Sequence, residues 1–107
     1  MTTYAERFAE ALNEKFQHTD LAKYAWTVEP GRKYDKIVQT DLHEFGAGQR
    51  HVHAFVERKT GALIKAASWK APQQDKDGVA VRYMLDTTEG MIAAIDAADQ
   101  YGMYLYK

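Results

Sequence analysis

The residues with the clearest chemical potential in this sequence are two histidines, His51 and His53, within a strand-like stretch. Residues two apart point to the same face of a strand, so both imidazoles could bind one metal ion. The neighbouring residues that could supply a third ligand are Asp41, His43, Glu44 and Glu57. This spacing is common by chance, and no second cluster of histidines or acids supports it. We therefore interpret both histidines as structural or surface residues, and we predict no metal and no cofactor.

The sequence gives even less support to a catalytic carboxylate pair or a catalytic nucleophile than to a metal site. Asp96 and Asp99 are expected on the outer face of a helix, and Asp75 and Asp77 in a loop, where solvated carboxylates are the simpler interpretation. Ser68 lacks the flanking glycines of a nucleophile elbow. The sequence contains no cysteine, which excludes a thiolate nucleophile or thiolate metal site. We therefore predict that the protein is not an enzyme.

A binding surface is the stronger hypothesis. The basic and aromatic side chains that could form it are Arg50, Arg58, Lys59, Lys65, Lys70 and Arg82, interleaved with Phe55, Trp69 and Tyr83. A strand surface with cations and aromatic rings can fix phosphates while it stacks bases. Pro72 keeps Ala71 extended, which directs the side chains before it. Two interpretations of Trp69 stay open: it covers the edge of the core as a lid, or it contacts a ligand together with Lys70.

Charge is distributed unevenly along the chain, although its formal net value is only −1. Residues 31–83 contain ten Lys and Arg against six Asp and Glu, a balance of +4. The flanking segments are acidic, at −2 for residues 1–30 and −3 for residues 84–107. This polarity could orient a charged partner, while a solvated surface of mixed charge is the simpler alternative.

A single domain must position these side chains, because 107 residues leave no room for a second core. We predict a first helix from about Thr3 to His18, with Thr3 and Glu6 as a capping box at its start. Its buried face follows a 3.6-residue period. The residues of that face are Ala5, Phe8, Ala9, Leu12 and Phe16.

A second helix is predicted from Thr88 to about Tyr101, with Asp86 or Thr87 as its cap. Its expected buried residues are Met91, Ile92, Ala94, Ile95 and Ala98. The last residues, Met103–Tyr106, are predicted to form an edge strand with Tyr104 and Tyr106 on one side.

Four or five strands are predicted between the helices. They are Ala25–Glu29, Tyr34–Thr40, Arg50–Glu57, Ala62–Ala67 and Val79–Leu85. Within the third, Val52, Ala54 and Val56 should share one face, and His51, His53 and Phe55 the other. Residues 42–49 and 70–78 are expected to be loops, and Gly61 is expected to adopt positive φ in a hairpin turn.

Short connections between consecutive strands favour an antiparallel sheet with helices on one face. The predicted fold class is therefore α+β, a small two-layer sandwich in one domain. Residues 1–24 would be a helical lead-in, residues 25–85 the sheet, and residues 86–107 the C-terminal helix and edge strand. The apolar runs are too short to span a membrane and the N-terminus lacks the features of a signal peptide, so we expect a cytosolic protein.

One stretch of the chain also carries a resemblance. The segments VHAFVERKTGALIKAASWKAP (residues 52–72) and VRYML (residues 81–85) resemble a group of small uncharacterised bacteriophage proteins, notably of phages of actinobacteria. Lys36-Ile37-Val38 matches a strand that precedes this hairpin in the group, while Leu63-Ile64-Lys65 differs from the tyrosine that many members have before the lysine. The similarity covers residues 34–85 and brings no catalytic or ligand residues with it. It implies a phage protein made in the cytoplasm of an infected bacterium.

The resemblance leads us to expect a non-catalytic accessory protein that binds a host macromolecule, with a host protein as the favoured partner. The alternative is binding of nucleic acid or a nucleotide by the basic and aromatic residues of the hairpin. A minor virion component is a third hypothesis. We expect no membrane partner, and an edge strand with exposed Tyr104 and Tyr106 would allow a homodimer.

Overall fold

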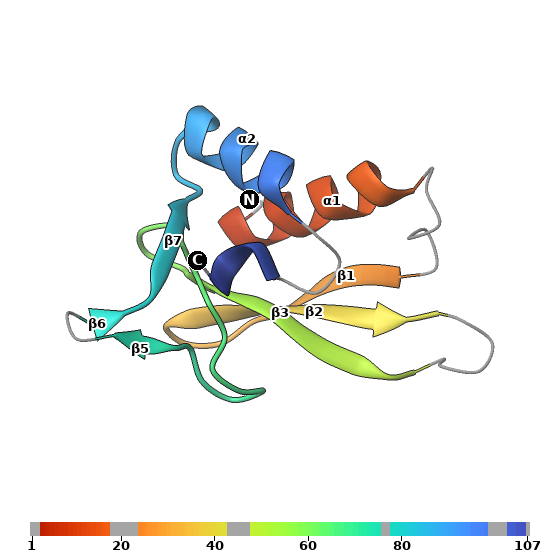
Figure 1. The fold of residues 1–107 in the computed structure, drawn as a ribbon, viewed down its shortest axis with the longest axis horizontal. Coiled ribbons are helices and arrows are strands. Elements are labelled where there is room, and N and C mark those ends of the chain that lie inside the picture. Colours follow the sequence, from red (N-terminus) through yellow and green to blue (C-terminus); the bar gives the residue numbers. More distant parts are fainter. Residues whose placement is uncertain (1–2, 18–23, 43–47, 76–77, 99–102, 107) are drawn as a thin grey trace.

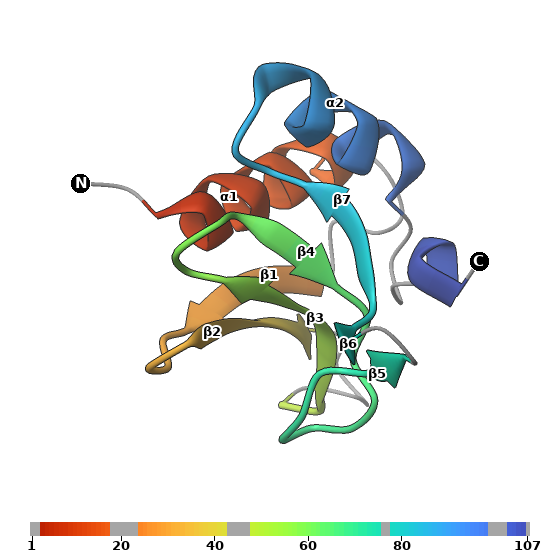
Figure 2. The ribbon, with the colours of Figure 1, turned by 90° about the vertical axis from the view of Figure 1, so that its left-hand side faces the viewer.

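The computed structural model describes residues 3–17, 24–42, 48–75, 78–98 and 103–106. Within them, five strands form one antiparallel sheet in the order β1-β2-β3-β4-β7, and two α-helices lie on one of its faces (Figures 1 and 2). These strands are β1 (Tyr24–Glu29), β2 (Tyr34–Asp41), β3 (Arg50–Glu57), β4 (Ala62–Ile64) and β7 (Val81–Met84). The predicted α+β fold class is confirmed. None of the described helices is long and apolar enough to cross a membrane.

The first helix, α1 (Tyr4–Phe16), follows the predicted pattern. The hydroxyl of Thr3 accepts a hydrogen bond from the backbone N–H of Glu6 at 3.1 Å, as in a capping box. The same hydroxyl donates to the Glu6 carboxylate at 3.2 Å. All five apolar residues expected to be buried are buried, because they form one stripe that faces the sheet. The predicted end of this helix at His18 lies outside the described residues.

The second helix, α2 (Thr88–Ala97), packs on β7 and α1. Thr87 is the cap, since its hydroxyl accepts a hydrogen bond from the N–H of Gly90 at 3.0 Å. Ala94 and Ala98 are buried as predicted, but Ile92 is 52% exposed. The prediction for Ile92 is therefore wrong: a short helix at the margin of the sheet buries only a narrow stripe.

The ammonium group of Lys15 joins the two helices. It donates hydrogen bonds to the backbone oxygens at the C-terminal end of α2, those of Ile95 (2.6 Å), Asp96 (3.1 Å) and Ala98 (2.9 Å). The last carbonyls of a helix lack partners within the helix and carry the negative end of its dipole. A cation held there both satisfies these oxygens and fixes α2 against α1.

Replacing Lys15 with methionine, which keeps most of the aliphatic side chain, is expected to destabilise the fold by about 1–3 kcal/mol. The loss arises because the carbonyls at the end of α2 lose a charged donor. Urea unfolding followed by circular dichroism measures the effect. The control is Glu10→Met at an exposed position of the same helix, which should change stability by less than about 0.5 kcal/mol. Equal stability of Lys15→Met and the wild type would contradict this role.

Trp26 of β1 is the centre of the core between the two layers, with only 1% of its surface exposed. Its ring centroid lies 5.1 Å from that of Phe16, and its ring meets His53 edge-on at 6.4 Å. The indole N–H donates to Nδ1 of His53 at 3.4 Å, and Nε2 of His53 lies 2.8 Å from the hydroxyl of Tyr104. Because an indole nitrogen can only donate, Nδ1 accepts and the ring proton lies on Nε2.

Strand β3 departs from the predicted alternation. The adjacent residues of β2 pair with residues two apart in β3: Ile37 with Ala54, and Val38 with Val52. The extra residue, His53, is accommodated by a β-bulge. As a result His53 contacts the core beneath the helices, whereas Phe55 and Val52 pack in a separate cluster on the other face. The predictions that His53 shares a face with Phe55, and Val52 with Ala54, are wrong because the bulge resets the alternation.

The sheet is shorter than predicted around β4. This strand ends at Ile64 rather than Ala67, after which the chain leaves the sheet. The segment predicted as a loop after residue 70 contains a small hairpin of β5 (Gln74–Asp75) and β6 (Gly78–Val79). The predicted strand Val79–Leu85 is therefore divided: Val79 belongs to β6, and β7 begins at Val81.

The C-terminal residues Met103–Tyr106 form a 3-10 helix, η2, and not the predicted edge strand. Tyr104 is 7% exposed and Leu105 is fully buried. Two successive side chains cannot both enter the core from a strand, whose residues alternate between faces, but a helical turn allows it. The basis for the expected homodimer, an exposed Tyr104 on a free strand, is thus wrong. The side chain of Tyr106 lies outside the described residues.

Candidate binding site on the outer face of the sheet

The face of the sheet turned away from α1 and α2, here the outer face, has a small apolar floor. Phe55 of β3 is buried there with Ala62 and Ile64 of β4. Tyr34 of β2 meets Phe55 edge-on with 6.4 Å between ring centroids. Lys36 lies opposite Phe55 in the β2–β3 register. The antiparallel pairing thus places an aromatic ring and a cation from β2 beside the apolar residues of β3.

The turn between β1 and β2 forms one wall of the site, and a buried carboxylate shapes it. Asp35 is 1% exposed and accepts a hydrogen bond from the N–H of Gly31 at 3.2 Å. Arg58 completes the arrangement: its Nε lies 3.5 Å from Oδ1 of Asp35, and its Nη1 donates to the Gly31 carbonyl at 2.8 Å. A Cβ at Gly31 would overlap the carbonyl oxygen of Tyr34, so only glycine fits this turn.

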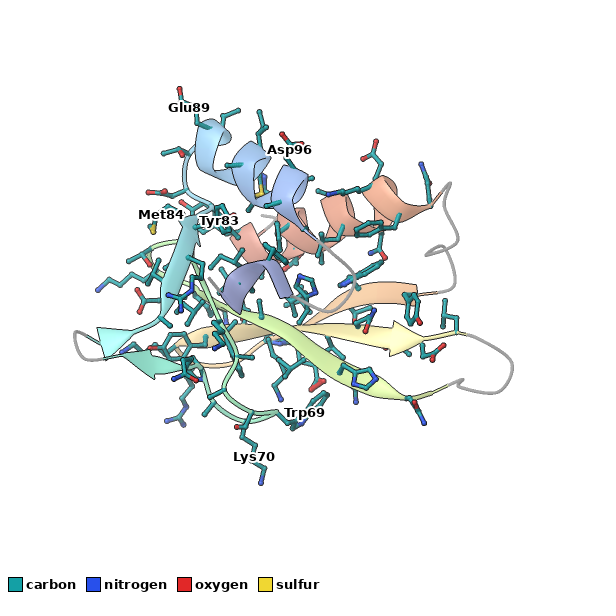
Figure 3. All side chains as sticks on the ribbon, in the orientation of Figure 1. Trp69, Lys70, Tyr83, Met84, Glu89 and Asp96 are labelled. Atoms are coloured by element: carbon teal, nitrogen blue, oxygen red, sulfur yellow. The ribbon has the colours of Figure 1, made fainter. Side chains whose placement is uncertain are left out.

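The opposite wall is residues 66–72, here the Trp69 loop. A bridge between Ala66 and Pro72 closes it, and Ala66 packs against the Phe55 cluster. Figure 3 shows Trp69 and Lys70 on the side of the sheet opposite α2. The loop therefore covers part of the outer face and presents its two central side chains at the surface.

Trp69 lies close to two cations of the sheet. The ring centroid is 4.1 Å from Nζ of Lys36 and 5.2 Å from Cζ of Arg50. Arg50 also forms an ion pair with Glu29 of β1. The indole is 36% exposed and belongs to neither apolar cluster of the core. Trp69 is thus held at the surface by cation–π contacts rather than buried as a lid.

Between these walls lies an open cleft of about 320 Å³, here the basic cleft. Its lining residues are Glu29, Pro30, Gly31, Arg32, Lys33, Tyr34, Lys36, Phe55, Lys70 and Pro72. Four of these are cations, while the one carboxylate is already paired with Arg50. Such a concentration of positive charge around aromatic rings suits a ligand with several negative charges.

Comparison with known sequences places the chain in a family. The whole chain, residues 1–107, matches a family described as a family of unknown function, DUF7717. The chain belongs to the DUF7717 family. No curated protein and no solved structure matched it.

In this DUF7717 protein, two of the residues predicted to bind a partner, Arg50 and Trp69, contact each other, and Lys70, which follows Trp69 in the chain, lines the basic cleft. Phe55 lines the same cleft from below. Arg58 was predicted as a contact residue, and its bonds to Asp35 and Gly31 make it a residue that positions the turn.

The other predicted binding residues of this DUF7717 protein lie outside the basic cleft. Lys59 is exposed in the turn between β3 and β4, and Lys65 follows β4. Arg82 donates from Nε to the backbone oxygen of Leu105 at 2.8 Å, which ties β7 to η2. Tyr83 packs in the core, 6.0 Å from Tyr104 between ring centroids. None of these four lines the cleft.

Sequence reasoning missed the cations of the turn and of β2, namely Arg32, Lys33 and Lys36, together with Tyr34. The alternation of β2 would have placed Tyr34 and Lys36 on one face. Pairing that strand in a hairpin register with β3 would have brought them beside Phe55. The position of the Trp69 loop across the sheet could not be predicted from strand alternation or pairing, because it depends on where β4 ends.

The two histidines do not form a shared site. His51 is exposed, whereas His53 is 3% exposed and bonded to Trp26 and Tyr104. Among the described residues, no three His, Cys, Asp or Glu side chains gather as metal ligands would. Of the predicted third ligands, His43 and Glu44 lie outside the described residues. His53 is therefore a structural residue of the core.

Proposed function

We propose that this protein is a non-catalytic accessory protein of a bacteriophage, which acts by binding a macromolecule of the host bacterium on the outer face of its sheet. The observation that carries the proposal is the convergence of four cations on the basic cleft, next to a surface tryptophan. These side chains come from three separate segments: the β1–β2 turn, β2 and the Trp69 loop. A cluster of cations attracts a partner of opposite charge, and exposed tryptophan is a frequent contact residue of binding surfaces.

The non-catalytic part of the proposal is supported by how the reactive side chains are used. His53 is engaged in the core by Trp26 and Tyr104, and Asp35 is engaged by the N–H of Gly31 and by Arg58. The hydroxyl of Ser68 accepts a hydrogen bond from the N–H of Lys70 at 3.3 Å, within its own loop. Each of these groups therefore has a structural role where it stands.

The phage origin rests on the hairpin motif of residues 52–72. In the fold, this motif builds much of the proposed site. Its strand residues form the floor of the cleft, its Gly61 occupies the left-handed region at φ 80°, and its last residues build the Trp69 loop. One motif thus supplies the floor and one wall of the proposed site.

Affinity capture tests the proposal. A tagged copy expressed in a bacterial host should recover one partner in stoichiometric amount, and Lys70→Glu should reduce its recovery at least about tenfold because a cleft cation becomes an anion. Arg7→Glu is the matched control: Arg7 is an exposed cation on α1, in the helix layer. Equal recovery by Lys70→Glu and the wild type would overturn the proposed site, as would a loss confined to Arg7→Glu.

A further inference from the structure

We propose that the macromolecule bound on the outer face is single-stranded nucleic acid. This inference rests on the proposed function and names its ligand. Four features of the molecule favour this ligand: the order of the cations along the face, the scarcity of exposed apolar side chains there, the size of the cleft, and the charge of the opposite layer.

The cations form a continuous chain along the outer face. It begins with Arg32 and Lys33 in the β1–β2 turn, continues through Lys36 and Lys70 in the cleft, and reaches Arg50 by way of the Trp69 ring. A string of cations across several elements matches a ligand whose negative charges repeat along its length. The phosphates of a single strand have this pattern, and each contact releases condensed counterions.

The same face offers little to a protein partner. Among the described residues, the exposed large apolar side chains are Leu42, Trp69, Val81, Met84 and Ile92. None of these five side chains lines the cleft, and of the five only Trp69 contacts one of its cations. Stable protein interfaces have a centre that is apolar and poor in charge. A cleft lined by four cations, with an indole in contact with one of them, fits a polyanion better.

The dimensions of the cleft favour a single strand over a duplex. Its volume of about 320 Å³ is close to the lower limit of small-molecule sites, which begin near 300 Å³. Such a cleft can admit one nucleotide with its base turned out, whereas bases inside a duplex remain stacked. Two aromatic side chains at the cleft are partly exposed: 36% of the surface of Trp69 is exposed, and Tyr34 is half-buried. Base stacking on such rings is the usual source of affinity for single strands.

The helix layer has the opposite charge. The exposed carboxylates of α1, α2 and the turn before α2 are Glu6, Glu10, Glu14, Asp86, Glu89 and Asp96. Figure 3 shows Glu89 and Asp96 pointing away from the sheet, on the side opposite Trp69. This layer repels a phosphate backbone, so a polyanion approaches by the outer face. Although the net charge of the chain is small, its cations concentrate on the outer face of the sheet and its exposed carboxylates on the helix layer.

Fluorescence anisotropy tests the inference with a labelled oligothymidylate of about 12 nucleotides, within the ~4–16 nucleotide range of single-strand binding modules. The wild type should bind it, and the logarithm of the affinity should fall against the logarithm of the salt concentration with a slope of about −3, as expected for four phosphate contacts. Lys70→Glu should weaken binding about tenfold and make this slope shallower. Arg7→Glu should bind as the wild type does. Trp69→Leu should also weaken binding, since an aliphatic side chain cannot stack a base.

The outcomes separate this inference from the proposed function. Absence of an anisotropy change at low salt would overturn the inference, as would tighter binding to a duplex of the same length. If, in addition, affinity capture recovered a host protein that Lys70→Glu loses, the proposed function would stand with a protein as the ligand. If Lys70→Glu affected neither oligonucleotide binding nor capture, both proposals would be wrong.

Discussion

Replacing Gly90 with alanine is expected to destabilise the fold by about 3 kcal/mol or more. At an ordinary position inside a helix the same change stabilises by about 1 kcal/mol, because alanine restricts the unfolded chain and glycine does not. Here a Cβ would overlap the carbonyl oxygen of Met84, at the end of β7. Helix α2 must therefore move away from the strand, and the contacts of Ala94 and Ala98 with the core are weakened.

Denaturant unfolding of Gly90→Ala measures this effect. A decrease in the free energy of unfolding indicates the close approach of α2 to β7, whereas an increase is the result expected at an ordinary helix position. Ala93→Gly, at an exposed position of the same helix, should cost only the ordinary ~1 kcal/mol of helix propensity. A Gly90→Ala protein as stable as the wild type would show that α2 does not pack against β7 as closely as described.

Truncation of the two tryptophans should destabilise the fold to very different degrees. Trp26→Ala is expected to cost about 3–5 kcal/mol, because it removes a fully buried ring and leaves Nδ1 of His53 without the indole donor. Trp69→Ala should cost only about 1 kcal/mol, the scale of its two cation–π contacts at a partly exposed site. The first substitution removes a large part of the roughly 5–15 kcal/mol that stabilises a typical domain, whereas the second leaves a stably folded protein with an altered surface.

Thermal unfolding of the two variants tests the surface position of Trp69. A cooperative transition close to that of the wild type in Trp69→Ala would agree with a surface role. Loss of that transition would instead mean that Trp69 closes the core as a lid, and binding data from its variants would then say nothing about contacts. Lys70→Glu remains informative in either case, since its side chain is exposed.

The amphipathic elements could be predicted from the sequence because their signals are local. The buried stripe of α1, the capping residue Thr3 and the positive φ of Gly61 each depend on a few neighbouring residues. The errors arise where distant segments decide the outcome. The bulge at His53 depends on how β2 pairs with β3, and the 3-10 turn at Tyr104 depends on space left by the core. Gln39 gives no sequence signal at all, although it is 1% exposed and its side-chain amide atoms have no hydrogen-bond partner among the residues that the structure describes.

The candidate site was predictable only in part for the same reason. The hairpin motif drew attention to Trp69 and Lys70 but left Trp69 open between a lid and a contact residue, and only the structure places its ring at the surface beside Lys36. Of the predicted cations, Lys70 lines the cleft and Arg82 of β7 is bonded to Leu105, while Lys36 of β2, which also lines the cleft, was not among those predicted. Which cations converge is set by strand order and by the path of the Trp69 loop, and neither follows from residue spacing.

The most direct test of the central claim is hydrogen–deuterium exchange of the protein with and without its captured ligand, because it maps the covered surface whatever the ligand is. The account predicts slower exchange in residues 30–36 and 66–72, the two walls of the basic cleft, with α2 unchanged. Slower exchange confined to α2 and β7, with both walls unaffected, would contradict the assignment of the outer face as the binding surface.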